Sequence, residues 1–271
     1  MIGVTGATGF IGSHLMEKLG EVGFAIDLRL EDDEIIKDLK NRSCDLIFHL
    51  ASPLPSNEKN KQDQIKNDTI NLAEKIVRIA DSLDNMRFIV LSTIRVHSNN
   101  ENCFTTNSEI NPIDGYGTGK MKMEKILMNS NHESFILRCS SVQGVDLNGK
   151  PRGLIGTFAK QEKEGALKIM GDGLAIKDFI HIDDLIILLF DLINVFPLDK
   201  SLIYPVGGGN KMDVITLANK FIDNKRCNLM YIEPALYELS GYVDNSELLD
   251  LIPWKPKWSI DNMINEARRA I

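Results

Sequence analysis

The stretch TGATGFIGSHL, residues 5–15, follows a short apolar segment at the start of the chain. It spaces three glycines as GxxGxxG, at Gly6, Gly9 and Gly12. In a strand–turn–helix unit the first glycine permits a tight turn and the second lets the backbone approach a pyrophosphate. The third allows helix and strand to pack closely, and the helix N-terminus then faces the phosphates. The stretch predicts a dinucleotide-binding loop, and the alternative is a glycine-rich turn that binds nothing.

Apolar strands alternate with helical patterns on the C-terminal side of this loop. The predicted strands are 1–5, 24–29, 45–51, 87–92 and 134–139, and the predicted helices lie near 11–19, 32–41, 62–83 and 118–130. Such alternation is typical of right-handed βαβ units around a parallel sheet. The predicted fold class is therefore α/β, a Rossmann-type doubly wound parallel sheet.

The regular alternation of predicted strands and helices changes after about residue 140. A loop rich in Gly and Pro is followed by predicted helices near 153–164, 184–195 and 213–223 and from about 259. We expect residues 1–140 to form an NAD(P)-binding Rossmann domain, with later segments interleaved. Residues 141–271 are expected to form mainly a smaller C-terminal α/β lobe that binds substrate.

Composition excludes several classes of protein. The 271 residues carry a net charge of −7 with no obviously basic face, which gives no support to binding of nucleic acid or an anionic membrane. The four cysteines form no CxxC pair, so free thiols in a reducing compartment are expected. No signal peptide is recognisable, and the apolar run at 185–190 is too short to span a bilayer. No metal site is expected, because Asp183 is better explained as a helix cap. The prediction is a cytoplasmic protein.

Asp27 lies 21 residues after Gly6, where an acidic residue would accept a hydrogen bond from a ribose 2′-hydroxyl of NAD. Arg29 would instead pair with the 2′-phosphate of NADP. Asp27 is equally compatible with a turn or an exposed strand face. NAD is favoured slightly, and NADP stays possible.

Tyr116 and Lys120 stand four residues apart in the sequence YGTGK, 116–120. On a helix this spacing places both on one face. Free tyrosine has a pKa of about 10, and a neighbouring ammonium favours the phenolate. The pair is either a proton-transfer device or a solvated surface pair. His49 is expected to be a core histidine with its hydrogen bonds satisfied.

The chain resembles the extended short-chain dehydrogenases/reductases, in particular the NAD-dependent epimerase/dehydratase family of nucleotide-sugar enzymes. The motifs run almost from end to end, as GATGFIG (6–12), DLIFHLAS (45–52), VLSTIRVH (90–97), YGTGK (116–120), LRCSSVQG (137–144), GDGLAIKDFIHIDDL (171–185), YPVGGGN (204–210) and LLDLIPWKPKWSI (248–260). The resemblance implies that Tyr116 is the catalytic acid/base, that Lys120 is its partner, and that the Thr93 hydroxyl holds the sugar oxygen.

The resemblance also implies two binding sets. The cofactor-binding residues would be Gly6, Thr8, Gly9, Phe10, Ile11, Gly12, Asp27, Arg29, Leu50, Ala51, Ser52, Leu91, Tyr116 and Lys120. The substrate-binding residues would be Ser92, Thr93, Ser141 and Lys177. The implied partners are a nucleotide-diphosphate sugar and a second copy of the chain, which would pair through the helices near 62–83 and 118–130.

Three departures from the family pattern carry information. Ile94 and Arg95 stand where the 4,6-dehydratases have an Asp-Glu pair, so dehydratase activity is not expected. Ser141 replaces an asparagine, and Lys177 replaces an arginine, which removes bidentate phosphate binding. Only 15 residues, 30–44, separate the second predicted strand from the third. Either the sheet has lost a strand there or one strand does two jobs.

The leading hypothesis is an NAD(P)-dependent nucleotide-sugar epimerase that transfers hydride at a ring carbon, C4. One alternative is an NAD(P)H-dependent nucleotide-4-keto-sugar reductase, since the same three residues serve both reactions. The other is a non-catalytic relative that only binds a dinucleotide.

Overall fold

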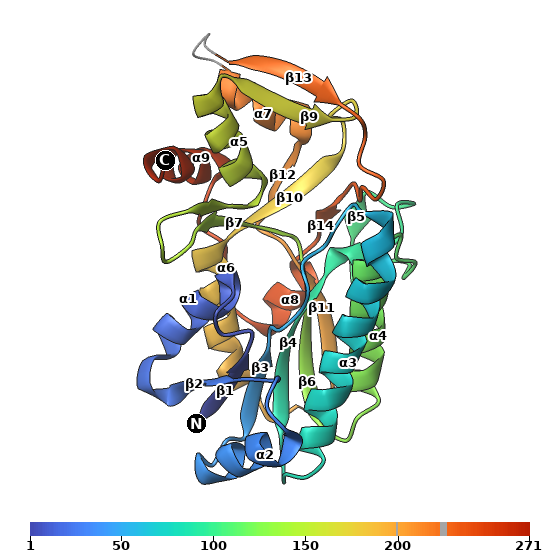
Figure 1. The fold of residues 1–271 in the computed structure, drawn as a ribbon, viewed down its shortest axis with the longest axis vertical. Coiled ribbons are helices and arrows are strands. Elements are labelled where there is room, and N and C mark those ends of the chain that lie inside the picture. Colours follow the sequence, from blue (N-terminus) through green and yellow to red (C-terminus); the bar gives the residue numbers. More distant parts are fainter. Residues whose placement is uncertain (199, 223–226) are drawn as a thin grey trace. The chain divides into compact units, whose positions relative to one another are not determined.

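The computed structural model describes residues 1–198, 200–222 and 227–271 (Figure 1). The chain divides into two compact units. The first comprises Met1–Ser98, Ile110–Arg138 and Leu188–Tyr204, and the second comprises Asn99–Glu109, Cys139–Ile187 and Pro205–Ile271. The main division thus follows Arg138, close to the expected position at 140. Residues 188–204 return to the first unit, and residues 99–109 belong to the second by their contacts.

A six-stranded sheet with the order β11-β6-β4-β3-β1-β2 forms the centre of the first unit. Its strands are β1 (Ile2–Thr5), β2 (Gly23–Ile26), β3 (Leu46–His49), β4 (Arg87–Thr93), β6 (Glu133–Cys139) and β11 (Leu202–Val206), and the ends of β6 and β11 continue into the second unit. The pairs β1–β2, β1–β3 and β3–β4 are parallel. This arrangement confirms the predicted Rossmann-type sheet.

Strand β2 is an edge strand of this sheet. Residues 27–45, all of them described, contain the helix α2 (Asp32–Asn41) and no strand. Of the two alternatives for this region, the structure therefore shows the loss of a strand. The consequence is that the end of β2 has no further strand beside it.

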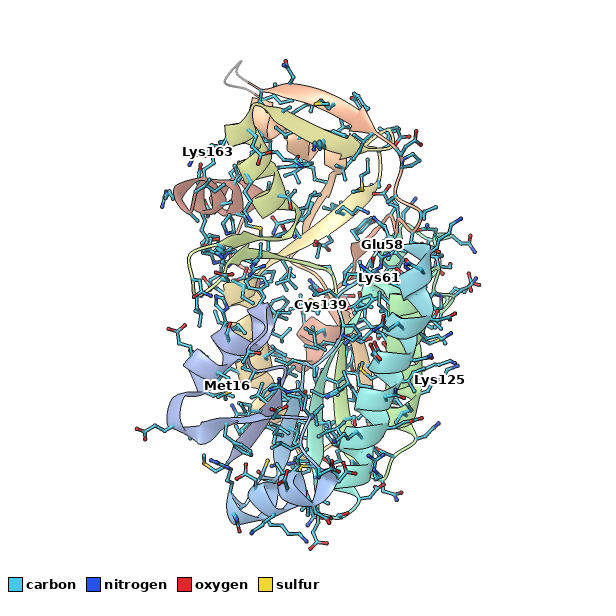
Figure 2. The ribbon with its side chains drawn as sticks, viewed as in Figure 1. Met16, Glu58, Lys61, Lys125, Cys139 and Lys163 are labelled. Atoms are coloured by element: carbon cyan, nitrogen blue, oxygen red, sulfur yellow. The ribbon has the colours of Figure 1, made fainter. Side chains whose placement is uncertain are left out.

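Helices cover both faces of the sheet (Figure 1). α2, α3 (Gln62–Ala80) and α4 (Gly115–Met128) bury apolar side chains against β2, β3, β4 and β6 in one core cluster. α1 (Phe10–Leu19) lies on the opposite face with the end of α6 (Ile182–Asp191), which continues as a 3-10 turn, Leu192–Val195. Lys125 marks the outer, exposed side of α4 (Figure 2).

The second unit has its own strands, helices and core. Its four-stranded sheet has the order β12-β10-β7-β8, with β12 (Asn210–Asp213), β10 (Ile176–His181), β7 (Ser141–Val145) and β8 (Pro151–Arg152). The unit also contains two separate two-stranded sheets. One pairs β13 (Asn228–Ile232) with β9 (Ala166–Met170), and the other pairs β14 (Tyr242–Val243) with β5 (Cys103–Phe104). Its other helices are α5 (Gly153–Glu164), α7 (Val214–Ile222), α8 (Ser246–Leu251) and α9 (Ile260–Arg269), and α5, α7 and α9 share one core cluster.

Two expectations about helices need comment. Asp183 is the second residue of α6 and not its cap, so its carboxylate complements the helix dipole from within the first turn. The predicted end of α7 at residue 223 lies outside the described residues, and the described helix ends at Ile222. Among the helices of the described ranges, none is long and apolar enough to cross a membrane.

Candidate active site

The ends of four strands meet at one edge of the large sheet. Thr5 pairs with Ile26 on β2 and with His49 on β3, so β1, β2 and β3 end at the same level. His49 pairs with Val90, and β4 continues beyond that level to Thr93. Open α/β sheets bind ligands at the carboxyl ends of their strands. The glycine loop, Asp27, Leu50 and Thr93 all follow or end strands at this edge.

The glycine loop has little room for side chains at two of its three glycines. Gly6 has a φ of +67°, and a Cβ there would lie 2.8 Å from the Ala51 nitrogen. A Cβ on Gly12 would lie 2.1 Å from the Gly6 oxygen, so this glycine permits packing of α1 on the loop itself. Gly9 has more space, with the Gly6 oxygen at 3.2 Å, and its N–H donates to that oxygen. Gly9 is therefore the least crowded of the three glycines, and its contact with a ligand stays a prediction.

A cavity of about 610 Å³ opens on this loop. Six of the predicted cofactor residues line it, namely Gly6, Thr8, Gly9, Leu50, Ala51 and Ser52. Pro53 and three residues of α3, namely Asp68, Asn71 and Leu72, complete the lining. Sequence reasoning missed the α3 residues, because polar residues on an amphipathic helix look like a solvated face. Phe10 and Ile11 begin α1 but do not line the cavity, and their role stays a prediction.

A buried Thr5–His49 pair joins β1 to β3 beneath the cavity. The Thr5 hydroxyl oxygen accepts from the backbone N–H groups of Leu50 and Ala51, each at 3.1 Å. The Thr5 hydrogen is then donated to His49 Nδ1, 3.0 Å away, which leaves the hydrogen of the neutral ring on Nε2. Burial lowers the pKa of His49 to about 3, and the charge of Lys120 acts in the same direction. His49 Nε2 is buried and has no partner among the described residues. The expectation of a fully satisfied core histidine is therefore wrong for Nε2.

Asp27 and Arg29 bind each other at the end of β2. Asp27 Oδ1 accepts from the Arg29 backbone N–H at 3.0 Å and from Nε at 2.8 Å, and Oδ2 accepts from Nη2 at 2.7 Å. The side-chain hydrogen bond from Arg29 lowers the pKa of Asp27 to about 2. The two residues whose competition would decide the cofactor thus form one bidentate pair in this structure.

Lys120 is buried beneath Tyr116. Only 2% of the lysine is exposed, and its Nζ lies 6.0 Å from the centroid of the Tyr116 ring. Nζ donates to the carbonyl oxygen of Leu91 at 2.7 Å, which ties α4 to the end of β4 two residues before Thr93. Burial lowers the pKa of Lys120 to about 8, and the Glu124 carboxylate acts in the opposite direction. The predicted face-sharing pair is therefore not a solvated surface pair.

A second buried charge network lies one helical turn beyond Lys120. Glu124 accepts from Arg138 through both carboxylate oxygens, at 2.9 to 3.3 Å, and from the Ser92 hydroxyl at 2.5 Å. Glu124, Arg138 and Ser92 are all less than 9% exposed. The predicted contact of Ser92 with substrate stays a prediction, and the structure directs its hydroxyl to Glu124. The network was missed because glutamate one turn after lysine on a helix resembles an exposed ion pair.

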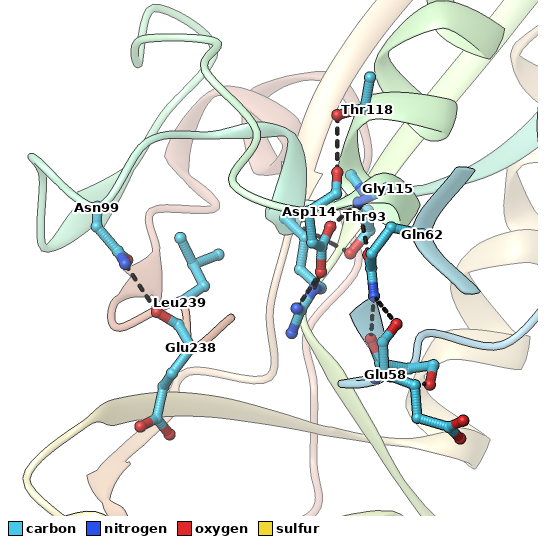
Figure 3. Close-up of polar contacts among 12 residues, drawn as sticks. Glu58, Gln62, Thr93, Asn99, Asp114, Gly115, Thr118, Glu238 and Leu239 are labelled. Carbon is cyan, nitrogen blue, oxygen red and sulfur yellow. Dashed lines mark hydrogen bonds and ion pairs between the residues drawn. The ribbon is translucent and has the colours of Figure 1, made fainter. Parts of the chain in front are cut away.

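The start of α4 is fixed from two sides (Figure 3). Asp114 is the N-cap residue, and its Oδ1 accepts from the Gly117 N–H at 2.6 Å. Gln62, at the start of α3, accepts from the Gly115 N–H at 2.8 Å through Oε1. Its amide nitrogen also donates to the Ser56 carbonyl at 2.7 Å. Tyr116 therefore lies between two glycines whose N–H groups are bound, one by Gln62 of α3 and the other by the cap residue Asp114.

The other two predicted substrate residues belong to the second unit. Ser141 begins β7, and its Oγ accepts from the Gln143 amide at 2.8 Å. Lys177, on β10, donates to the Leu239 carbonyl at 2.6 Å and forms an ion pair with Glu238 at 3.1 Å. β7 and β10 are neighbouring parallel strands, so the two residues lie near each other within this unit. Their contact with substrate stays a prediction.

Comparisons with known proteins identify the family and its relatives. Residues 2–195 match the profile of the NAD dependent epimerase/dehydratase family. A Bacillus subtilis (strain 168) protein named uncharacterized UDP-glucose epimerase YtcB is 24% identical over 305 residues, covering 97% of this chain and 95% of the relative.

Solved structures share the fold. The UDP-glucuronic acid 4-epimerase from Bacillus cereus, in complex with UDP-glucuronic acid and NAD, superposes with a TM-score of 0.86 at 20% identity, covering 99% of this chain and 98% of that one. A structure described as the NAD dependent NDP-hexosamine 5,6-dehydratase TunA gives 0.85 at 20% identity, covering 99% and 96%.

Proposed function

The chain belongs to the NAD dependent epimerase/dehydratase family, and from that premise we propose that it is a nucleotide-sugar 4-epimerase that uses NAD. The observation that carries the proposal is the buried Lys120 beneath the Tyr116 ring, anchored to the Leu91 carbonyl two residues before Thr93. A protein that only binds a dinucleotide has no use for a phenol paired with a buried ammonium group. Its burial is a cost that a catalytic role explains.

The residues at the sheet edge fit NAD. Backbone without a Cβ at Gly9, the N-terminus of α1 and a cavity of about 610 Å³ together accommodate a pyrophosphate and its flanking groups. Bound there, NAD would supply a hydride acceptor that returns the hydride to the other face of the sugar. Gly6, Thr8 and Gly9 would hold the phosphates, and Leu50, Ala51 and Ser52 would lie beside them.

Three side chains would then move or hold protons at the sugar. Tyr116 would take the proton of the C4 hydroxyl and return it after the sugar has rotated to present its other face. The Lys120 ammonium favours the phenolate form of Tyr116 that this step needs. The Thr93 hydroxyl accepts from the Arg95 backbone N–H at 3.3 Å, so its own hydrogen is available for the sugar oxygen. Ser141 and Lys177 would contact the nucleotide part of the substrate.

Two observations bear on NAD against NADP. Arg29 is engaged bidentately by Asp27, and a 2′-phosphate would have to displace that carboxylate from the guanidinium. The Bacillus cereus structure holds NAD. We therefore expect a lower dissociation constant for NADH than for NADPH, measured by fluorescence titration. A tighter constant for NADPH would reverse this choice.

A 4-keto-sugar reductase is the second candidate, and the loss of a strand beside β2 favours it, because some such reductases have a similarly shortened N-terminal half. Stoichiometry separates the two reactions. An epimerase interconverts two nucleotide sugars with no net change in NADH, whereas a reductase consumes one NADH for each 4-keto sugar reduced. Absorbance at 340 nm measures this difference directly. Dehydratase activity is not expected, because Ile94 and Arg95 supply no acid–base pair after Thr93.

Tyr116→Phe tests the proposal. The variant keeps the ring and loses the transferable proton, so we expect epimerisation of UDP-glucose or UDP-glucuronic acid to fall on the order of 10²–10⁴-fold. The matched control is Tyr204→Phe, a tyrosine of β11 whose ring stacks on Phe135 at 5.6 Å. Parent turnover in the Tyr116 variant would overturn the assignment of the acid/base.

A homodimer through α3 and α4 is also proposed. α3 carries more apolar positions than one narrow stripe needs, and Ile65, Ile76, Ile79 and Ala80 are already buried within this chain. Among the half-buried apolar side chains of α3, Val77 packs on the core cluster and Leu72 lines the cavity on the glycine loop, which leaves Ile70 for a partner. Light scattering that gives a monomer mass at every concentration would count against the dimer.

A further inference from the structure

We propose that the ion pair between Arg95 and Asp114 is a positioning device that holds Thr93 and Tyr116 in register with each other. The inference rests on the proposed function, because it assigns a task within that catalytic site. Neither residue touches the reacting atoms in this account. Both act through the two elements that carry the catalytic side chains.

The two oxygens of Asp114 perform different tasks. Oδ1 accepts from the Gly117 N–H and caps α4, the helix that begins with Gly115 and Tyr116. Oδ2 accepts from Arg95 Nε at 2.9 Å and from Nη2. The Asp114 side chain is 1% exposed, whereas that of Arg95 is 24% exposed. A single buried carboxylate thus joins the cap of the tyrosine helix to a neighbouring element.

That neighbouring element is the 3-10 turn Ile94–Val96, which directly follows β4. The backbone N–H of Arg95 donates to the Thr93 hydroxyl oxygen. The guanidinium of the same residue reaches Asp114. Arg95 therefore orients the threonine hydroxyl with its backbone and holds the tyrosine helix with its side chain.

Backbone packing makes this link sensitive to small shifts. A Cβ on Gly117 would lie 2.2 Å from the Arg95 oxygen, so the first turn of α4 lies directly against the 3-10 turn. On the other side, a Cβ on Gly115 would lie 2.1 Å from the Gln62 oxygen. Tyr116 is the residue between these two glycines. Weakening the ion pair releases the turn on the Arg95 side only, so Tyr116 would pivot away from Thr93.

The Arg95–Asp114 ion pair contributes more to positioning than to stability. A buried ion pair recovers little net free energy, because desolvation offsets the attraction. Its geometry is nevertheless specific, since two guanidinium nitrogens of Arg95 donate to the one Asp114 oxygen that the helix cap does not use. A displacement of about 1 Å in a catalytic group can cost on the order of 10²-fold in rate. The pair is therefore worth more to the reaction than to the fold.

The test uses Asp114→Asn in the full-length protein. Asparagine caps helices as well as aspartate does, so the variant keeps the cap and loses the charge. We expect kcat for the nucleotide sugar to fall by on the order of 10²-fold, while KM and the NADH dissociation constant stay within about threefold. The control is Asp38→Asn, which removes the exposed Arg42–Asp38 pair and should leave kcat, KM and the NADH dissociation constant unchanged.

A double-mutant cycle with Arg95→Met isolates the pair. The double variant should be no slower than either single variant, because the contact has already been lost. Arg95→Lys should recover part of the rate, since lysine keeps the charge without the planar fork. If Asp114→Asn does not fold, Arg95→Lys and Arg95→Met carry the test. Parent kcat in a folded variant, or equal losses in kcat and NADH affinity, would overturn the proposal.

A readout independent of turnover separates this inference from the proposed function. Incorporation of 3-fluorotyrosine reports the environment of Tyr116 by ¹⁹F NMR without any ligand. We expect the Tyr116 resonance to shift in Asp114→Asn and to stay in place in Asp38→Asn. If the parent protein turns over no nucleotide sugar, the proposed function fails, while the resonance still decides whether the pair positions Tyr116. An unchanged Tyr116 resonance in Asp114→Asn would disprove the positioning role.

Discussion

Replacing Lys120 with methionine should abolish turnover and make the folded protein more stable. The lysine is 2% exposed, and burial lowers its pKa from 10.5 to about 8. At about 1.4 kcal/mol for each pKa unit, this depression corresponds to about 3 kcal/mol of unfavourable free energy in the folded protein at pH 7. Methionine fills similar space without a charge to desolvate.

The hydrogen bond from Lys120 Nζ to the Leu91 carbonyl offsets part of this cost. A hydrogen bond from a charged group contributes about 1.5–3 kcal/mol. The expected net effect of Lys120→Met is therefore an increase of about 1 kcal/mol in the free energy of unfolding at pH 7. Urea unfolding followed by circular dichroism measures this increase.

The effect of Lys120→Met on stability should depend on pH. The folded pKa lies below the unfolded one, so the unfolded state binds more protons between pH 8 and 10.5. The cost of Lys120 is complete below pH 8 and disappears as the pH rises toward 10.5. The advantage of Lys120→Met should therefore shrink from pH 7 to pH 10.

Lys125→Met is the matched control, because Lys125 lies on the exposed side of the same helix (Figure 2). It should change stability by less than about 0.5 kcal/mol at either pH. A Lys120→Met variant less stable than the parent by more than about 1 kcal/mol at pH 7 would contradict this prediction. So would a stability difference that is the same at pH 7 and pH 10.

Two further predictions concern the sheet edge. Gly9→Val should keep the fold and abolish NADH binding, and retained NADH affinity in this variant would contradict the assigned loop. Gly12→Ala should instead lower the melting temperature, because a Cβ on residue 12 would lie 2.1 Å from the Gly6 oxygen. The pKa of His49 is about 3 in the folded protein and 6.5 in the unfolded chain. Below pH 6.5 only the unfolded state takes up the proton, so the free energy of unfolding falls as the pH falls. Between pH 7.5 and pH 5 the parent should lose about 2 kcal/mol of unfolding free energy that His49→Asn does not lose, and equal slopes for the two proteins would disprove the buried neutral ring.

The first half of the fold was predictable because each element has a local pattern. The predicted helix near 11–19 is α1 within one residue, and the predicted helix 32–41 is α2. α4 begins three residues before its predicted start, because Asp114 caps a turn whose glycines gave no helical pattern. By contrast, β5 and β14 are two-residue strands that pair across about 140 residues of sequence, and no local pattern marks either one.

The candidate site divides in the same way. The glycine loop and the Tyr116–Lys120 spacing are local, so the sequence alone indicated them. The contacts around Lys120 join distant segments, as when Glu124 on α4 binds Arg138 on β6. A charged side chain carries no mark of burial in its own residue type. These partners become visible only when the fold brings the segments together.

The three glycines at the start of α4 also have a consequence for how the protein folds. Each of Gly115, Gly117 and Gly119 disfavours a helix by about 0.8–1.0 kcal/mol relative to alanine. A helix of 14 residues with this start is not stable alone, so its first turn must wait until α3 and the 3-10 turn are in place. Substitutions in that turn should then speed unfolding more than they slow folding. In a refolding experiment, the return of catalytic activity would report completion of the native state, and not the earlier formation of the sheet.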